Sequence, residues 1–258
     1  MTKKSPARVA LSSPLRVDAV DALRGLAMVW MTVFHFSFDL NQFGYLKQNF
    51  YRDPLWTWQR TLIVSLFLFC AGLGQAIAVA QGQSWPRFWR RWAQVLICAL
   101  LVTLGSWWMY PQSYIYFGVL HGMALMLVIA RLTASWGARL WWLGAGAIAA
   151  QLIAVYAMNT WATVEFVKIL NSPQLNWLGL ITRKPITEDY VPLLPWLGVM
   201  WWGVAAGTWL TRHGATLAWP LPAAFKPLAL LGRWSLSYYM LHQPVLLGGL
   251  MAVGWLAK

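Results

Sequence analysis

The sequence predicts an all-α protein, a polytopic bundle of about seven transmembrane helices, with a range of seven to nine. Two observations carry this prediction. Hydrophobic residues make up 59% of the 258 residues and charged residues only 10%, whereas a soluble domain carries about 25% charged residues. A helix needs about 20 largely apolar residues to cross roughly 30 Å of hydrocarbon, and seven segments of the chain have about that length.

The seven predicted spans follow one another with mostly short connections. They cover residues 21–40, 60–81, 92–110, 114–132, 139–158, 192–211 and 234–256. Because the connections are short, we expect residues 1–258 to form a single domain, with a cytoplasmic segment at 1–20 and an outer loop at 159–191. The first span contains His35 and lacks a small-residue cleavage site at its end, so we expect it to be retained.

Positive charge predicts the orientation of the bundle, because loops rich in Lys and Arg stay in the cytoplasm. With the N-terminus inside, thirteen basic residues fall on the inner side and seven on the outer side. The inner set is Lys3, Lys4, Arg8, Arg16, Arg24, Arg87, Arg90, Arg91, Arg131, Arg139, Arg212, Lys226 and Arg233, and the outer set is Lys47, Arg52, Arg60, Lys168, Arg183, Lys184 and Lys258. The sequence therefore predicts a cytoplasmic N-terminus and an outer C-terminus.

Composition and cysteine usage exclude other classes of protein. In a soluble protein a net charge of +13 would suggest a nucleic-acid partner, but here the basic residues lie between apolar segments and no nucleic-acid motif accompanies them. Cys70 and Cys98 both lie inside apolar segments, without metal-ligand spacing. We therefore expect the lipid bilayer as a partner, and no nucleic acid, metal or disulfide.

The first span carries a polar stripe. Asp21, Arg24, Thr32, His35 and Asp39 share one helical face, and ionisable residues within a span usually face the bundle interior and mark function. Asp39 lies one turn after His35 and could stabilise the imidazolium that forms when His35 takes a proton, as in a general-base dyad. The alternative is a helix-end Asp39 in water and a histidine bonded to a nearby carbonyl, and spacing alone leaves both open.

Other segments add polar residues to the apolar region. The last span holds Arg233, Ser235, Ser237, Tyr238, Tyr239, His242 and Gln243. Pro244 can kink this helix, and His121 places a third imidazole in the fourth span. Glu188 and Asp189 are expected at an outer entrance to the bundle, although the long outer loops are equally explained as solvated connections.

Five segments resemble a known family. They are VDALRGLAMVWMTVFH, FLFCAGLGQAIA, FGVLHGMAL, DYVPLLPWLG and LGRWSLSYYMLHQPVL. They resemble the multi-span acyltransferases that include heparan-α-glucosaminide N-acetyltransferase and its bacterial relatives. The first segment is also similar to the wider family of membrane sugar O-acyltransferases, in which an Arg and a His lie eleven residues apart, as Arg24 and His35 do. Segment 41–59 contains no histidine, whereas the animal lysosomal enzyme has its essential histidine there, so the acceptor stays open.

The resemblance implies the roles of the site residues. In the wider family the histidine is the catalytic base and the arginine contacts the acyl donor. Arginine also suits the donor's phosphates because of its forked N–H donors. The resemblance carries these roles onto His35 and Arg24 only. Together with the other polar residues of the spans and the outer entrance, the expected site residues are His35 and Asp39 for catalysis, Arg24 and Arg233 for the donor, and His121, Asp189 and His242 for the acceptor.

The function expected from this resemblance is acyl transfer in a bacterial inner membrane. A cytoplasmic acyl-CoA, with acetyl-CoA first among the donors, would acylate a sugar amine or hydroxyl, or another small polar acceptor, at the outer face. A homodimer is compatible with the sequence. The alternative is a transporter or channel for a small polar solute, which predicts internal repeats and paired broken helices; we find no repeat. A non-catalytic membrane subunit is a third interpretation.

Overall fold

The computed structural model describes residues 17–213 and 221–256, and within these ranges the chain forms helices and no β-strand. The predicted all-α class is therefore confirmed. Residues 1–16 of the predicted cytoplasmic segment lie outside the described ranges, and so does Lys258 of the predicted outer basic set.

Seven long helices correspond to the seven predicted spans. They are α1 (Asp18–Gln42), α2 (Pro54–Ala80), α3 (Trp85–Met109), α4 (Val119–Thr133), α5 (Arg139–Thr160), α7 (Trp196–Arg212) and α9 (Ser235–Leu256). The connections contain α6 (Val164–Asn171), α8 (Lys226–Arg233) and the 3-10 turns η1 (Ala134–Trp136), η2 (Asn176–Leu178) and η3 (Ala223–Phe225).

Five of the long helices, α1 to α5, are long and apolar enough to cross a membrane, α4 together with the turn η1 that follows it. Helix α7 has 17 residues, slightly fewer than the about 20 that a full crossing needs. Helix α9 has 22 residues, but His242, Gln243 and Pro244 in its middle lower its mean hydropathy. The structure thus confirms a helical membrane protein with five candidate spans, and the count of about seven stays a prediction.

Helix α4 begins later than the sequence predicts. The expected start was residue 114, but residues 113–117 are extended loop whose carbonyl groups bond to the segment ahead of α7. Glu188 N donates to Ser113 O at 2.9 Å, and Val191 N donates to Phe117 O at 3.2 Å. These carbonyls are therefore engaged across the two loops and are not free to start a helix.

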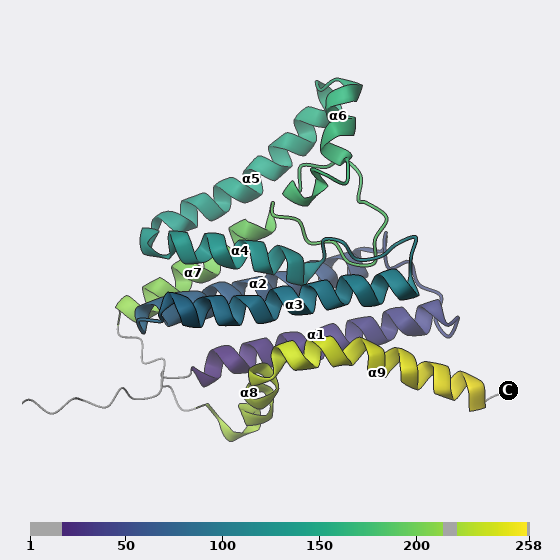
Figure 1. Cartoon of the computed structure of the whole chain (residues 1–258), viewed down its shortest axis with the longest axis horizontal. Helices are drawn as coiled ribbons and strands as arrows, with labels where there is room; N and C mark the ends of the chain where they lie inside the picture. Colours follow the sequence, from purple (N-terminus) through teal and green to yellow (C-terminus); the bar gives the residue numbers. More distant parts are fainter. Residues whose placement is uncertain (1–16, 214–220, 257–258) are drawn as a thin grey trace, which may run out of the picture.

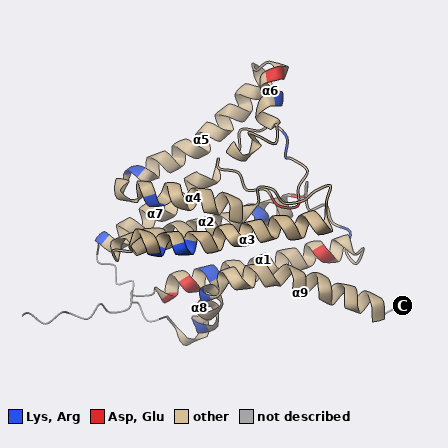
Figure 2. Cartoon of the chain, in the orientation of Figure 1, with Lys and Arg blue, Asp and Glu red and all other residues tan. Residues whose placement is uncertain are grey.

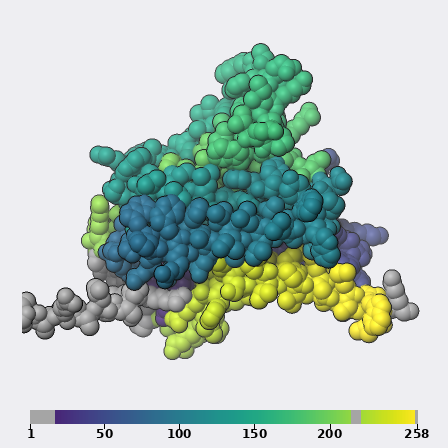
Figure 3. All heavy atoms as spheres, viewed as in Figure 1, coloured from purple at the N-terminus to yellow at the C-terminus, as the bar shows by residue number. Residues whose placement is uncertain are grey.

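The helices form two layers and a projecting arm (Figure 1). Helices α1 and α9 lie side by side in one layer, and α2, α3, α4 and α7 form the other. Helix α5 leans away from the bundle and carries α6 at its far end, and α8 packs across the start of α1. Figure 3 shows the same arrangement in full atoms, with α3 covering the near face above α9 and the α5–α6 arm projecting from it.

Glycines bring α2 and α7 into backbone contact. A methyl group added at Gly72 of α2 would lie 2.2 Å from Met200 O of α7, and one added at Gly203 of α7 would lie 2.2 Å from Phe69 O. Gly72 and Gly203 therefore allow α2 and α7 to pack closely. Small residues at such crossings allow the van der Waals contact that holds membrane helices together.

The buried apolar residues form one main cluster between α2, α3, α4 and α7, centred on Leu68, Met126, Met200 and Val204. A second cluster, which includes Met28, Met31 and Phe67, joins α1 to α2 and the first outer loop. The second cluster thus packs the two layers against each other where α1 meets α2.

Basic residues gather at one end of the bundle, where the α2–α3 and α4–α5 connections meet the C-terminal end of α7 (Figure 2). This end carries Arg87, Arg90, Arg91, Arg131, Arg139 and Arg212. We call it the inner end and the opposite end, with the α1–α2 and α3–α4 connections, the outer end, following the predicted orientation.

Candidate active site

Six polar side chains line the contact between α1 and α9, and we call them the polar seam. They are Thr32, His35 and Asp39 of α1 and Tyr238, His242 and Gln243 of α9. The α1 members are three and four residues apart, so they lie on successive turns of one face. The seam therefore runs as three pairs from the middle of α1 toward its outer end.

The first pair joins two hydroxyl groups, since Thr32 Oγ1 lies 2.7 Å from Tyr238 Oη. In the second pair the His35 and His242 rings have centroids 5.2 Å apart and meet edge to face. In the third pair Gln243 Nε2 donates to both carboxylate oxygens of Asp39, at 2.8 and 3.0 Å. A hydroxyl pair, an imidazole pair and a carboxylate–amide pair are thus stacked in order.

Asp39 is almost completely buried, with 1% of its surface exposed, and its carboxylate is bound by Gln243. Within residues 17–213 and 221–256, no hydrogen bond joins His35 to Asp39. The side chain that faces the His35 ring across the seam is the His242 imidazole. The predicted dyad of His35 and Asp39 therefore does not form a direct contact here, because the carboxylate is turned toward α9.

His242 has a defined tautomer. Its Nδ1 lies 2.7 Å from the Tyr239 carbonyl oxygen, and because a carbonyl can only accept, Nδ1 carries the hydrogen. The other nitrogen, Nε2, is then an acceptor, and it is buried without a partner among the described residues. His242 as a whole is 8% exposed.

Arg24 and Arg233 lie together at the inner end of α1, in a cluster with two carboxylates. Arg24 Nη1 donates to Asp21 Oδ1 at 3.0 Å and faces Gly232 O at 3.5 Å. Arg233 Nη2 donates to Asp18 at 2.7 Å, and its Nε lies 3.8 Å from Asp21 Oδ2. The structure thus brings together the two arginines that the sequence assigned to the donor.

Helix α8 reaches this cluster because both helices have a glycine at the contact. A methyl group at Gly25 would lie 1.9 Å from Leu228 O, and one at Gly232 would lie 1.8 Å from Asp21 O. On the other side of Arg24 lies Gly74 of α2, where an added methyl group would make an ordinary contact of 3.4 Å with Arg24 Nη2. The close approach of α8 to α1 therefore depends on Gly25 and Gly232.

His121 lies apart from the seam, at the start of α4. Gly118 N donates to His121 Nδ1 at 3.3 Å, so Nε2 carries the hydrogen and faces Thr103 Oγ1 at 3.0 Å. Thr103 in turn donates to Ile115 O at 2.7 Å. Both ring nitrogens are thus bound within the protein, and the role of His121 toward the acceptor stays a prediction.

Asp189 caps the same helix from the opposite loop. Its Oδ2 accepts a hydrogen bond from Val119 N at 2.7 Å, which satisfies one of the free N–H groups at the start of α4. Burial raises the pKa of this carboxyl above its usual range, against the opposing effect of the Val119 bond and of Lys184 nearby. Its predicted contact with the acceptor also stays a prediction.

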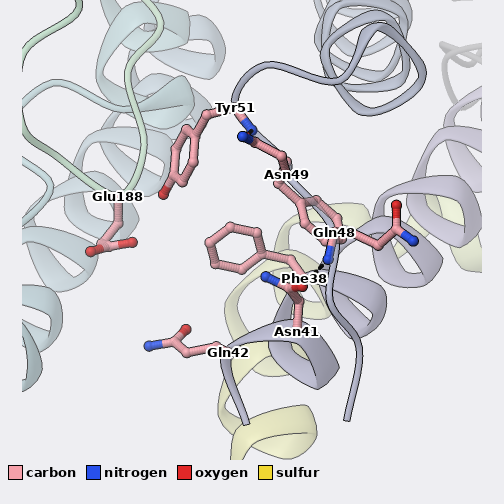
Figure 4. A pocket seen from close by; sticks show the side chains of 8 residues that line it. Phe38, Asn41, Gln42, Gln48, Asn49, Tyr51 and Glu188 are labelled. Carbon is pink, nitrogen blue, oxygen red and sulfur yellow. Dashed lines mark hydrogen bonds between the residues drawn. The ribbon is translucent and has the colours of Figure 1, made fainter. Parts of the chain in front are cut away.

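A pocket of about 390 Å³ opens at the outer end beside the seam. It is lined by Phe38, Asn41, Gln42, Gln48, Asn49, Phe50, Tyr51 and Glu188. Figure 4 shows the end of α1 and the following loop on one side, with Glu188 facing Tyr51 from the loop ahead of α7. The α1 residues of the pocket, Phe38, Asn41 and Gln42, flank Asp39 in the sequence, so the pocket lies at the end of α1 that carries the outermost pair of the seam.

The carboxamides of this pocket have fixed orientations. Asn41 Oδ1 accepts from Gln48 N at 2.7 Å, and Asn49 Oδ1 accepts from the backbone N–H groups of Tyr51 and Arg52. Because backbone N–H groups only donate, the accepting atoms must be the amide oxygens. The amide NH₂ groups of Asn41 and Asn49 are left for a ligand, so they favour one that presents oxygen atoms.

Sequence reasoning missed this pocket, although a signal was present. The stretch that follows the first span contains four carboxamides within nine residues, Asn41, Gln42, Gln48 and Asn49. Polar amides interleaved with aromatic rings at a span end are suited to a sugar-like ligand. Among the described residues no group of three or more His, Cys, Asp or Glu is placed to hold a metal ion.

Comparison with known families supports the identity that these features suggest. The family described as heparan-alpha-glucosaminide N-acetyltransferase, catalytic, matches residues 16–244, a range that includes the arginine cluster, the outer pocket and the whole polar seam. No curated protein and no solved structure gives a significant match to the chain. The protein therefore belongs to the heparan-α-glucosaminide N-acetyltransferase family and is an integral membrane protein of the acetyltransferase class.

Proposed function

We propose that this protein takes an acetyl group from acetyl-CoA at the inner face and transfers it to the amine or hydroxyl of a sugar bound at the outer face. The observation that carries the proposal is the polar seam, which runs from the middle of α1 toward the end of the helix where the outer pocket lies, with the arginine cluster at the opposite end of the same helix. Polar groups so placed in a membrane helix are expected to serve function.

The donor would enter from the inner end. Arg24 and Arg233 lie there within an ion-pair cluster that leaves part of each side chain exposed, 24% for Arg24 and 39% for Arg233. Arginine pairs readily with phosphate oxygens through parallel N–H donors. From Arg24 to His35 is eleven residues, or about 16 Å along the helix. The phosphates would thus stay at the cytoplasmic end while the extended thiol arm reaches the seam.

His35 is the proposed base. It would take the proton from the acceptor's amine or hydroxyl while the freed lone pair attacks the thioester carbonyl. Collapse of the tetrahedral intermediate breaks the C–S bond, and the departing CoA thiolate takes the proton back from His35. A positioned base of this kind contributes about 10²- to 10⁴-fold in rate. Asp39, which is held by Gln243, would act on His35 electrostatically from one helical turn away.

The acceptor is proposed to bind in the outer pocket. The NH₂ groups of Asn41 and Asn49 would donate to sugar oxygens, and the rings of Phe38 and Tyr51 offer apolar faces. Glu188 supplies a carboxylate at the far wall, where Ser113 Oγ also donates to it.

We further propose that the protein lies in a bacterial inner membrane with its N-terminus in the cytoplasm, as the basic inner end supports.

The proposal is tested with the purified protein in lipid nanodiscs, radiolabelled acetyl-CoA and a panel of amino sugars and neutral sugars. Product should form with the parent protein, and His35→Ala should lower kcat by about 10²-fold or more. Arg24→Ala should raise KM for acetyl-CoA, since it removes a donor contact. Phe36→Ala, at a lipid-facing position that is 41% exposed, is the matched control. Equal turnover by the parent and His35→Ala would refute the role of His35.

The polar seam would also fit a second function, the transport of a small solute. A polar seam in a membrane bundle would also serve the passage of a small polar solute. Solute uptake into proteoliposomes by a protein that transfers no acetyl group would favour transport over catalysis.

A further inference from the structure

We propose that His242 positions the catalytic base: its Nε2 accepts a hydrogen bond from the ring N–H of His35 and holds the other His35 nitrogen toward the acceptor. This inference rests on the proposed function. It assigns to an imidazole of α9 the orienting role that helix spacing alone would give to Asp39. Three observations on the described residues carry it.

The first observation is the tautomer of His242. The Tyr239 carbonyl accepts from Nδ1 at 2.7 Å, so the hydrogen of the neutral ring is on Nδ1 and Nε2 holds a lone pair. The bond to its own helix also fixes the direction of the ring. His242 is therefore built as a hydrogen-bond acceptor directed away from its own backbone.

The second observation is that His242 Nε2 has no hydrogen-bond partner in the described part of the chain. His242 is 92% buried, since only 8% of it is exposed, and Nε2 has no partner among the described residues. A buried polar atom without a partner has lost its hydration with no hydrogen bond in return, so such an atom calls for a function or a ligand. The nitrogen becomes satisfied as soon as an N–H donor turns toward it.

The third observation is the neighbour that can supply this donor. The His35 and His242 ring centroids are 5.2 Å apart and the rings meet edge to face. At this separation, a rotation of the His35 ring that points its N–H at His242 Nε2 gives an N–H···N bond of about 3 Å. Asp39 is occupied by Gln243, which binds both of its oxygens. Tyr238 is engaged with Thr32. Two acceptor atoms of the seam lack a partner among the described residues, His242 Nε2 and Gln243 Oε1, and the His242 ring is the one that contacts the His35 ring.

The consequence for the reaction follows from proton counting. When neutral His35 donates its N–H to His242, its second nitrogen is a lone-pair acceptor for the proton of the sugar amine or hydroxyl. After that proton arrives, both nitrogens of His35 carry hydrogen, and the bond to His242 becomes charge-assisted and stronger. The CoA thiolate then takes the proton, and both rings return to their starting tautomers. The protein therefore has the same protonation state before and after the reaction, and the acceptor's proton departs on the CoA thiol.

Two substitutions of His242 separate this role from a packing role. His242→Asn keeps an N–H that can reach the Tyr239 carbonyl but removes the acceptor at the position of Nε2. His242→Gln carries a carbonyl oxygen far enough out to accept from His35. Leu241→Ala, at the neighbouring position that is 61% exposed, is the matched control for a change on α9.

The experiment measures kcat and KM for acetyl-CoA in nanodiscs, with thermal unfolding as a check that each variant is folded. We expect His242→Asn to lower kcat by about 10- to 100-fold with an unchanged donor KM, and His242→Gln to recover at least part of that loss. In a His35→Ala background, His242→Asn should cause no further loss, because His242 acts through His35.

Several results would overturn the inference. These are parent-like kcat in His242→Asn, a rise in donor KM without a fall in kcat, equal losses in the Asn and Gln variants, or an additive loss in the double variant. Failure of the proposed function looks different, because then the parent protein transfers no acetyl group or His35→Ala retains full activity. The two failures are therefore distinguishable within one set of variants.

Discussion

Substitution of Gly232 by alanine should disrupt the arginine cluster from a distance. The added methyl group would lie 1.8 Å from Asp21 O and 2.9 Å from Gly25 N. To restore an ordinary contact of 3.4 Å to the oxygen, α8 and α1 would have to separate by 3.4 minus 1.8, or about 1.6 Å. Backbone atoms on both helices meet here, so no side-chain rotation relieves the clash.

The size of the effect can be estimated from this displacement. Overpacking typically costs about 1–3 kcal/mol, and we expect the upper part of that range because the obstacle is backbone. Separation of the helices would also lengthen the contact of Arg24 with Gly232 O, now 3.5 Å, and draw Arg233 away from Asp18. Gly232→Ala should therefore lower thermal stability and raise KM for acetyl-CoA, with a smaller effect on kcat.

The assay compares thermal unfolding and donor KM in nanodiscs for Gly232→Ala and for Gly105→Ala. Gly105 of α3 has nothing within 4 Å of an added methyl group, and there alanine should stabilise the helix by up to about 1 kcal/mol. If both variants unfold at the same temperature and bind acetyl-CoA alike, the close contact of α1 with α8 does not support the donor site.

Three further predictions concern the outer half of the site. Asp39→Asn should lower kcat by about 10-fold or less, because the charge is lost but a contact with Gln243 survives, and donor KM should not change. A fall in kcat as large as that of His35→Ala would make Asp39 a direct participant in the reaction. Glu188→Gln removes a negative charge from the pocket and Gln42→Glu adds one, so with a charged sugar the two variants should shift the acceptor KM in opposite directions. An unchanged acceptor KM in both variants would show that the pocket is not the acceptor site. Asp189→Ala should lower stability by about 1 kcal/mol through loss of the α4 cap, while Asp189→Asn retains it; equal unfolding temperatures of the two variants would contradict the capping role.

The sequence predicted the positions of the long helices well because membrane spans are specified locally. A run of apolar residues of sufficient length must satisfy its backbone internally, and a helix does so within one segment. The start of α4 was missed because it depends on a distant segment: Ser113 O and Phe117 O bond to the loop at 188–191. Helix α8 was missed because eight residues leave too weak a pattern.

The candidate site shows the same division between local and distant information. Helix periodicity correctly aligned His35 and Asp39 on one face of α1, and it suggested that they act together. It could not show that Gln243 would bind Asp39, because these residues are 204 positions apart. The contact between His35 and His242 likewise depends on how α9 packs beside α1.

The most direct test of the central claim is a sidedness experiment with sealed proteoliposomes. Protein oriented with its inner end toward the lumen is supplied with labelled acetyl-CoA inside only and with amino sugar outside only. The α1–α9 seam predicts labelled acetylated sugar in the outer solution, and predicts none with His35→Ala. Product that forms only when donor and acceptor are on the same side would contradict transfer through the bundle along the polar seam.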